Sequence, residues 1–152
     1  MTAKLLLRML GPMDQLGLCW QAGESLLASV DFGEDSELQR HHVLLALQEM
    51  VTNVLRHAYD GDESQPIEVE FSVCAATFAI ELRDRGPEFD PLEHDVAKLL
   101  EDASMPTAVG GFGIHIARLV MDQVSHARRN GWNILRMEKR VAVRAERKAG
   151  DA

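Results

Sequence analysis

The sequence lacks the features that mark several large classes of protein. None of its apolar runs approaches the roughly 18 residues that suggest a membrane-spanning helix. The start, from Met1 to Arg8, has an apolar stretch of only three residues before a charge, which is typical of a first strand rather than a secretory signal. We therefore expect a cytoplasmic protein that does not bind membranes.

Cysteine and metal-binding patterns are also scarce. Cys19 and Cys74 stand far apart in apolar contexts, so we expect two buried thiols in a reducing compartment. The six histidines show no spacing typical of metal ligands, and the adjacent His41 and His42 would point in different directions from a helix. The sequence therefore predicts no zinc site.

Positive charge is outweighed by negative charge. The formal net charge of −8 argues against nucleic acid as a main partner. Residues 136–152 differ, because six basic residues there face only three acidic ones. We interpret residues 144–152 as a flexible basic tail after a single domain of residues 1–143. The alternative is that this basic end is a binding patch.

Hydrophobic periodicity predicts alternating helices and strands. The strongest helical pattern runs from Glu37 to about Ala58, where apolar residues recur at steps of three and four. Two hairpins are expected, one turning through residues 74–76 and one at Asn130-Gly131. The expected strands are 3–10, 67–73, 77–83, 124–129 and 132–143, and the other expected helices are 13–30 and about 113–124. This order predicts an α+β two-layer sandwich, a mixed, mostly antiparallel sheet with helices on one face.

Three segments carry residue types that suit a nucleotide. Glu49 and Asn53 lie four residues apart on the long helix, so their side chains project in nearly the same direction. Asn53 offers a neutral oxygen that suits a Mg²⁺ ion shared with phosphates, and Glu49 can take a proton from a nearby hydroxyl or water. At the end of a strand, Asp84 can accept a hydrogen bond from an exocyclic amine, and Gly86 lets a flat ring approach the backbone.

The third segment is Gly110-Gly-Phe-Gly, which precedes a helix. Glycines at this position leave free N–H groups at the positive end of the helix dipole, where a phosphate can bind. It is not a P-loop, because no Lys-Ser/Thr pair follows. Each segment alone is common in proteins. Their occurrence together and in this order predicts a site for ATP with Mg²⁺.

The three segments together resemble the GHKL ATPases, whose fold is the Bergerat ATP-binding sandwich. The closest resemblance is to the anti-sigma factor serine-protein kinases of bacterial partner-switching systems, the RsbW-like and sporulation types, over roughly residues 8–141. The stretch from Glu49 to Tyr59 is similar to the N-box of that family, and Asp84 to Pro91 is similar to its first glycine box. The segment from Gly110 resembles the second glycine box, and Asn130-Gly131 resembles the turn of the closing hairpin.

The resemblance implies a role for each matching position. Asn53 would ligate Mg²⁺, Asp84 would bind the adenine amine, Gly86 would pack under the base and Glu49 would be the general base. The other residues expected at the nucleotide are His57, Phe89, Gly110, Gly111, Phe112 and Gly113, with the glycines at the phosphates. His57 could instead be a second catalytic group or a structural residue, and Phe112 could serve packing alone.

Glu49 also bears on the group that receives the phosphate. Histidine kinases share this fold but usually have Asn at the position of Glu49. A neutral imidazole already has a nucleophilic lone pair, whereas a serine hydroxyl must lose a proton. The resemblance therefore implies an ATP-dependent protein serine/threonine kinase that acts as an anti-sigma factor. Its expected partners are an anti-anti-sigma (STAS) protein, phosphorylated on a serine, a sigma factor and, in a homodimer, a second copy of the chain.

Two features depart from the family pattern. Glu88 stands where the first glycine box often has its second glycine, and no basic residue occurs from Glu101 to Gly113, where some relatives carry an arginine near the terminal phosphate. The second departure motivates an alternative, an ATP-dependent module that captures a partner with little or no kinase activity. A further alternative is an ATPase that forms ADP without a partner. Residues 92–112 are expected to form a lid, part helix and part mobile loop.

Overall fold

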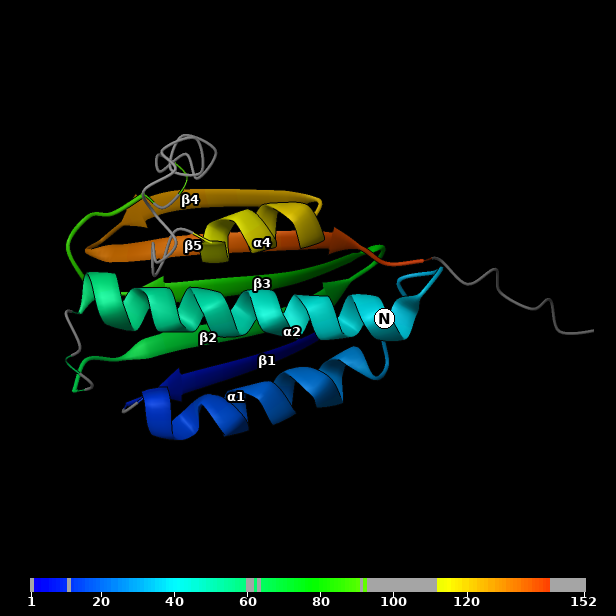
Figure 1. The fold of residues 1–152 in the computed structure, drawn as a ribbon, viewed down its shortest axis with the longest axis horizontal. Helices are drawn as coiled ribbons and strands as arrows, with labels where there is room; N and C mark the ends of the chain where they lie inside the picture. Colours follow the sequence, from blue (N-terminus) through cyan, green and yellow to red (C-terminus); the bar gives the residue numbers. More distant parts are fainter. Residues whose placement is uncertain are drawn as a thin grey trace, which may run out of the picture.

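The computed structural model describes residues 2–10, 12–59, 62, 64–90, 92 and 112–142 (Figure 1). Apart from Leu92 and Phe112, the predicted lid at 92–112 lies outside the described residues, and so does the predicted basic tail at 144–152.

Five described strands form one sheet with the order β1-β2-β3-β5-β4, and every pairing in it is antiparallel. The strands are β1 (Thr2–Met9), β2 (Ile67–Cys74), β3 (Thr77–Asp84), β4 (Gln123–Arg129) and β5 (Trp132–Arg140). The helices are α1 (Pro12–Leu27), α2 (Ser36–Asn53) and α4 (Phe112–Val120), and a π-helical turn, η1 (Val54–Ala58), continues α2. All three α-helices of the described residues cover the same face of the sheet (Figure 1), which confirms the α+β sandwich with helices on one face.

The strands follow from their alternation of apolar and polar side chains. In β2 the apolar residues from Ile67 to Val73 are buried, and the polar residues between them are half-buried on the other face. On that outer face Arg83 forms ion pairs with Glu68, Glu70 and Glu81 at 3.0–3.3 Å. The alternation therefore gives the sheet one face for the core and one charged face for solvent.

The buried side of α2 forms the other half of the core. Val43, Leu47 and Met50 are each at most 1% exposed, and Phe71 on β2 and Phe78 on β3 are fully buried. Burying one such side chain contributes about 1.5–3 kcal/mol. The three- and four-residue spacing along α2 therefore fixes which side of this helix faces the sheet and which side remains free for chemistry.

Both hairpin turns lie where the sequence predicts them. The turn between β2 and β3 contains Ala75 at φ 52°, and the turn between β4 and β5 contains Asn130 at φ 52° and Gly131 at φ 81°. Positive φ at both central residues is the backbone that an Asn-Gly pair favours in a two-residue hairpin. Cys19 is buried as expected, but Cys74 is exposed, because β2 ends at this residue and the chain turns.

Several element ends differ from the prediction. The first helix ends at Leu27 rather than residue 30, because the chain turns at Ala28 and Ser29. The helix expected to reach about residue 124 ends at Val120, since β4 already begins at Gln123. The strand expected to reach residue 143 ends at Arg140, where its pairing with β3 stops. Apolar residues in the turns extend a periodic pattern beyond the hydrogen-bonded element.

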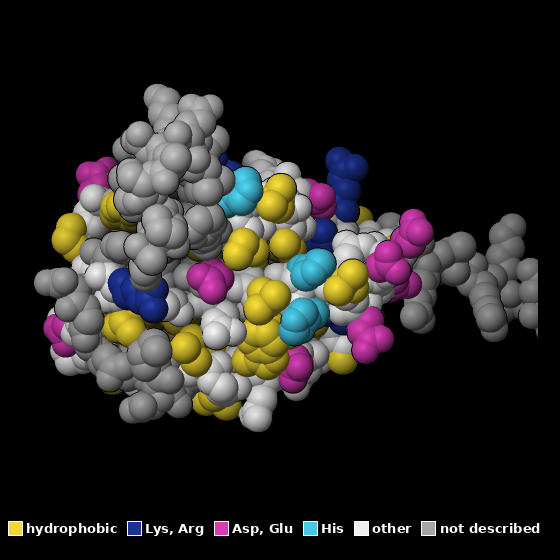
Figure 2. Space-filling model, in the orientation of Figure 1, with side chains coloured by type: hydrophobic (Ala, Val, Ile, Leu, Met, Phe, Trp, Pro, Cys, Tyr) yellow, Lys and Arg dark blue, Asp and Glu magenta, His cyan; other side chains and the backbone are white. Residues whose placement is uncertain are grey.

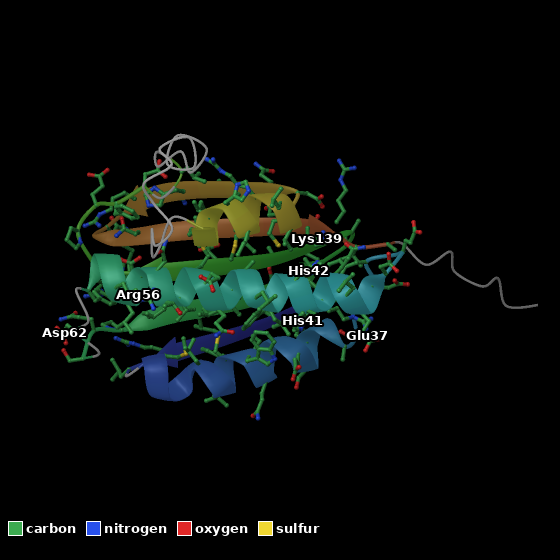
Figure 3. The ribbon with its side chains drawn as sticks, in the orientation of Figure 1. Glu37, His41, His42, Arg56, Asp62 and Lys139 are labelled. Carbon is green, nitrogen blue, oxygen red and sulfur yellow. The ribbon has the colours of Figure 1, made fainter. Side chains whose placement is uncertain are left out.

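The helix-covered surface carries exposed apolar side chains between α2 and α4 (Figure 2). Leu45, Ile116, Leu119 and Val120 line a groove there, and Leu119 is 73% exposed. Figure 3 labels His41 and His42 near the beginning of α2 and Arg56 in the turn at its other end. Within the described part of the chain, no helix combines the length and apolar character required to cross a bilayer.

Candidate nucleotide site

A partly open pocket lies between the end of α2 and the sheet. Its floor consists of two rows of paired strand residues. Asp84 on β3 pairs with Asn133 on β5 in one row, and Leu82, Leu135 and His126 follow one another across β3, β5 and β4 in the next. Paired residues in antiparallel strands project from the same face, so these side chains share the floor. The other lining residues are Met50, Asn53, Val54, Ala58 and Phe89.

Asp84 is a buried carboxyl with one oxygen already satisfied. Its Oδ1 accepts hydrogen bonds from the Gly86 N–H and from Asn133 Nδ2, both at 2.9 Å, and the residue is 6% exposed. Among the described residues no group donates a hydrogen bond to Oδ2. Burial raises the pKa of this carboxyl, and the bonds from Asn133 and Gly86 offset part of that increase. Asp84 therefore retains a free acceptor that a donor group of a ligand can satisfy.

Asn133 holds the loop that follows β3. Its Nδ2 also donates to the carbonyls of Pro87 at 2.9 Å and Gly86 at 3.3 Å, and its Oδ1 accepts from Arg128 at 3.1 Å and from the Phe89 N–H at 3.4 Å. A buried amide that bonds at both ends fixes its partners in one arrangement. Asn133 thus positions both the carboxyl of Asp84 and the backbone beside it.

The π-helical turn η1 and Tyr59, which follow α2, contact the same loop after β3. The Tyr59 hydroxyl donates to the Pro66 carbonyl and accepts a hydrogen bond from the Arg85 N–H at 2.6 Å. A Cβ built on Gly86 would lie 2.6 Å from the Ala58 Cβ and 2.8 Å from the Ala58 carbonyl oxygen. The chain needs glycine at position 86 because the loop lies directly against η1. Packing of Gly86 under a base stays a prediction.

Glu49 lies on the exposed side of α2, one turn before Asn53. The first turn of α4 packs against it, because a Cβ on Gly113 would be 3.1 Å from the Glu49 Cβ and 2.8 Å from the Met50 Cε. The fold therefore brings the beginning of α4, the end of a helix that suits an anion, to the Cβ and backbone of Glu49.

The structure brings most of the predicted site residues together. Asn53, Asp84 and Phe89 line one pocket, Gly86 adjoins it, and Glu49 meets Gly113 at the beginning of α4. Two predicted residues, Gly110 and Gly111, lie outside the described residues. His57 is placed in η1 and Phe112 at the start of α4, but the described structure does not extend to their side chains.

Sequence reasoning missed Asn133 and His126. Both are polar residues at positions where the alternation along the strand calls for an inward-facing apolar residue. Asn133 lies on the same face of β5 as the buried Leu135 and Met137, and His126 lies two residues after Val124 on the same face of β4. A polar residue at such a position needs a buried partner or a ligand. That signal was present in the sequence, but the pairing of Asp84 with Asn133 requires the strand order, in which β5 lies beside β3.

These residues fit a purine nucleotide with its phosphates towards α4. The apolar pocket residues suit a flat ring, Asp84 Oδ2 suits an amine, and the start of α4 suits an anion. Within the residues that the structure describes, no three His, Cys, Asp or Glu side chains converge as a metal cage. A Mg²⁺ ion that is shared with phosphates needs only one or two protein oxygens, so Asn53 fits such an ion.

Comparison with known proteins agrees with this geometry. Residues 15–139 match the histidine kinase-like ATPase domain family. The serine-protein kinase RsbW of Listeria monocytogenes serovar 1/2a is 30% identical over 123 residues, which cover 76% of this chain and 68% of that protein. The serine/threonine-protein kinase BtrW of Bordetella bronchiseptica is 27% identical over 106 residues, covering 68% of this chain and 72% of that protein.

Among solved structures, the histidine kinase AdeS of Acinetobacter baumannii aligns with 91% of this chain and 67% of its own, with a TM-score of 0.47 and 12% identity. The family match implies that the nucleotide is ATP. The chain belongs to the histidine kinase-like ATPase domain family, in its branch of serine-protein kinases, and is a protein serine/threonine kinase.

Proposed function

We propose that this kinase phosphorylates a serine of an anti-anti-sigma (STAS) protein and acts as an anti-sigma factor in a partner-switching system. The relatives named serine-protein kinase RsbW support this assignment. In the proposed cycle the unphosphorylated STAS protein binds the kinase and competes with a sigma factor, and phosphorylation ends that binding. The proposal places the cycle in the cytoplasm.

The position of Glu49 carries the proposal. Its side chain is exposed, lies beside Gly113 at the start of α4 and is one helical turn from Asn53. Asp84 lies in the pocket floor, so the two carboxyl groups have different surroundings and suit different parts of a nucleotide. Glu49 is thus accessible to the hydroxyl of a partner protein, at the end of the site where the phosphates would lie.

The transfer step follows from these positions. The serine oxygen forms a bond to the terminal phosphorus of ATP, the bond from that phosphorus to the bridging oxygen breaks, and ADP leaves. Glu49 takes the proton of the serine hydroxyl. Asn53 would hold Mg²⁺, which supplies positive charge to the phosphate oxygens when it is bound. The N–H groups at the start of α4 would bind the same phosphates.

Replacing Glu49 tests the assigned base. We expect Glu49→Gln to lower the rate of phosphoserine formation on the STAS partner by about 10²- to 10⁴-fold, the usual contribution of a general base, while ATP binding is preserved. The rate is measured by mass spectrometry of the partner after incubation with Mg-ATP, and binding by calorimetry.

Gln48→Ala is the matched control, because Gln48 is the preceding exposed residue on the same helix, and it should transfer phosphate at the parental rate. Transfer by Glu49→Gln at the parental rate would show that Glu49 is not the base. Absence of ATP binding by the parental protein would refute the nucleotide site itself.

A second candidate function is an ATP-dependent switch module with little or no kinase activity. It is favoured by the absence of any basic residue from Glu101 to Gly113, where charge on the terminal phosphate would be neutralised. This alternative predicts that Mg-ATP promotes capture of the partner while neither protein acquires a phosphate. Size-exclusion chromatography of the mixture, followed by mass spectrometry, separates the two functions and also tests the proposed homodimer.

A further inference from the structure

His126 is a pocket residue to which neither the family comparison nor the proposed reaction gives a role. It lies on β4, at the edge of the sheet, and lines the same pocket as Asp84 and Asn133. Its side chain is 7% exposed, and its Nε2 has no hydrogen-bond partner among the described residues. Leaving a buried polar atom unsatisfied costs about 1–3 kcal/mol, so such an atom needs an explanation.

The other ring nitrogen determines what Nε2 can offer. His126 Nδ1 lies 3.9 Å from Asp90 Oδ1, which is too long for a direct hydrogen bond. The negative charge of the carboxylate nevertheless favours a proton on the ring nitrogen that is nearer to it. A neutral imidazole carries one proton, so Nε2 then has a lone pair and acts as an acceptor.

The polar groups of the pocket floor are therefore mainly acceptors. Asp84 Oδ2 is one, and His126 Nε2 is the second. The donors next to Asp84 already have partners, since Asn133 Nδ2 bonds to Asp84 and to the Pro87 carbonyl, and Arg128 Nη1 bonds to the Gly86 carbonyl at 2.7 Å. A ligand that satisfies this floor must bring N–H groups, and an exocyclic amine has two.

We propose that His126 is a specificity-determining residue of the nucleotide pocket. With Asp84, it accepts the hydrogen bonds of an amine at position 6 of a purine and disfavours a purine with a carbonyl oxygen at that position. Two acceptors facing that oxygen would remain unpaired, which is how a polar site rejects an analogue. The inference rests on the proposed nucleotide site and extends it from the binding of a nucleotide to the choice of base.

A pair of near-isosteric variants tests this role. His126→Gln keeps a polar atom near the Nε2 position, whereas His126→Asn keeps one only near Nδ1. Calorimetry with Mg-ATP and with the Mg complex of purine riboside triphosphate, which lacks the 6-amine, gives the dissociation constants. We expect His126→Asn to weaken ATP binding about tenfold, the value of one hydrogen bond, and to leave the amine-free analogue unchanged. His126→Gln should bind ATP within about threefold of the parental protein.

The matched control is His42→Asn, on the exposed side of α2 far from the pocket (Figure 3), which should bind both nucleotides as the parental protein does. If His126→Asn binds ATP unchanged, or loses affinity equally for both nucleotides, the inference is overturned and the proposed function stands. A parental protein that binds no ATP overturns the proposed function and this inference with it.

Discussion

At the scale of a single residue, the buried carboxyl of Asp84 favours ligand binding but lowers the stability of the ligand-free fold. The carboxyl is buried, and its pKa is raised above its ordinary value of 3.8 mainly because burial disfavours the charge. The folded state thus holds the proton more tightly than the unfolded chain. As pH rises above 3.8 the unfolded chain ionises first, so the fold loses stability until the raised pKa is passed. The free apoprotein is therefore less stable at neutral pH because it retains a charged acceptor for a ligand.

Replacing the Asp84 carboxyl should separate its effect on ATP affinity from its effect on stability. In Asp84→Asn the amide oxygen can still accept from Gly86 and Asn133, but the amide N–H group replaces the free acceptor Oδ2. We expect ATP affinity to fall about ten- to a hundredfold, since the lost bond involves a charged group. Urea unfolding of the free protein at pH 7 should show unchanged or greater stability, with the gain disappearing below pH 3.8. Lower stability of the variant at pH 7 would contradict this account.

Gly86 lies so close to Ala58 that there is no room for an added Cβ. We expect Gly86→Ala to destabilise the fold by about 1–3 kcal/mol in urea unfolding, because the new Cβ would meet the Cβ and backbone of Ala58. Gly17→Ala is the control: Gly17 lies in α1 with no atom within 4 Å of an added Cβ, so alanine should stabilise the helix by about 0.5–1 kcal/mol. Equal stability of the position-86 variant and the parental protein would show that Ala58 can move away at no cost.

At the scale of an element, the β4–β5 hairpin contains a turn that the sequence predicts and a site residue, Asn133, that it does not predict. Asn130-Gly131 indicates the turn because few residue pairs tolerate positive φ at both positions. Asn133 follows two residues later, so the turn fixes the register in which it lies opposite Arg128 on β4, and the separate pairing of β5 with β3 brings it opposite Asp84. The turn chemistry is local and readable from the sequence, whereas the contact across strands depends on the position of β5 beside β3.

The hairpin turn should therefore be sensitive to one side chain. We expect Gly131→Ala to cost about 1–2 kcal/mol, because an alanine at φ 81° is strained. For a protein of this size that loss lowers the midpoint of thermal unfolding by about 2–8 °C, which circular dichroism can measure. Asn130→Gly is the matched control and should leave the midpoint nearly unchanged, since glycine tolerates φ 52°. A Gly131→Ala protein that melts with the parental one would exclude this strain.

At the scale of the whole molecule, the two-layer arrangement could be predicted from the sequence. The residues of the pocket floor could be predicted only in part. The period of α2 and the alternation in β2 and β3 follow from where apolar side chains must lie, so the layers are readable from these residues. Asp84 was recognisable because it ends a strand before a glycine. His126 and Asn133 were visible only as polar breaks in an apolar alternation, and their roles could not be predicted, because these arise from neighbours more than 30 residues away in the chain.

The strand order has a consequence for how the protein is made. β5 is synthesised after β4 but lies between β4 and β3 in the sheet. The edge of β3 that pairs with β5 therefore has no hydrogen-bonding neighbour until the ribosome has released the chain beyond Arg140. During that interval a nascent chain exposes an unpaired strand edge, which favours pairing with other chains. Asp84 also lacks Asn133 during this time. Nucleotide capture is therefore a property of the completed hairpin, and a chain that stalls at β4 would present its N-box helix without a nucleotide pocket.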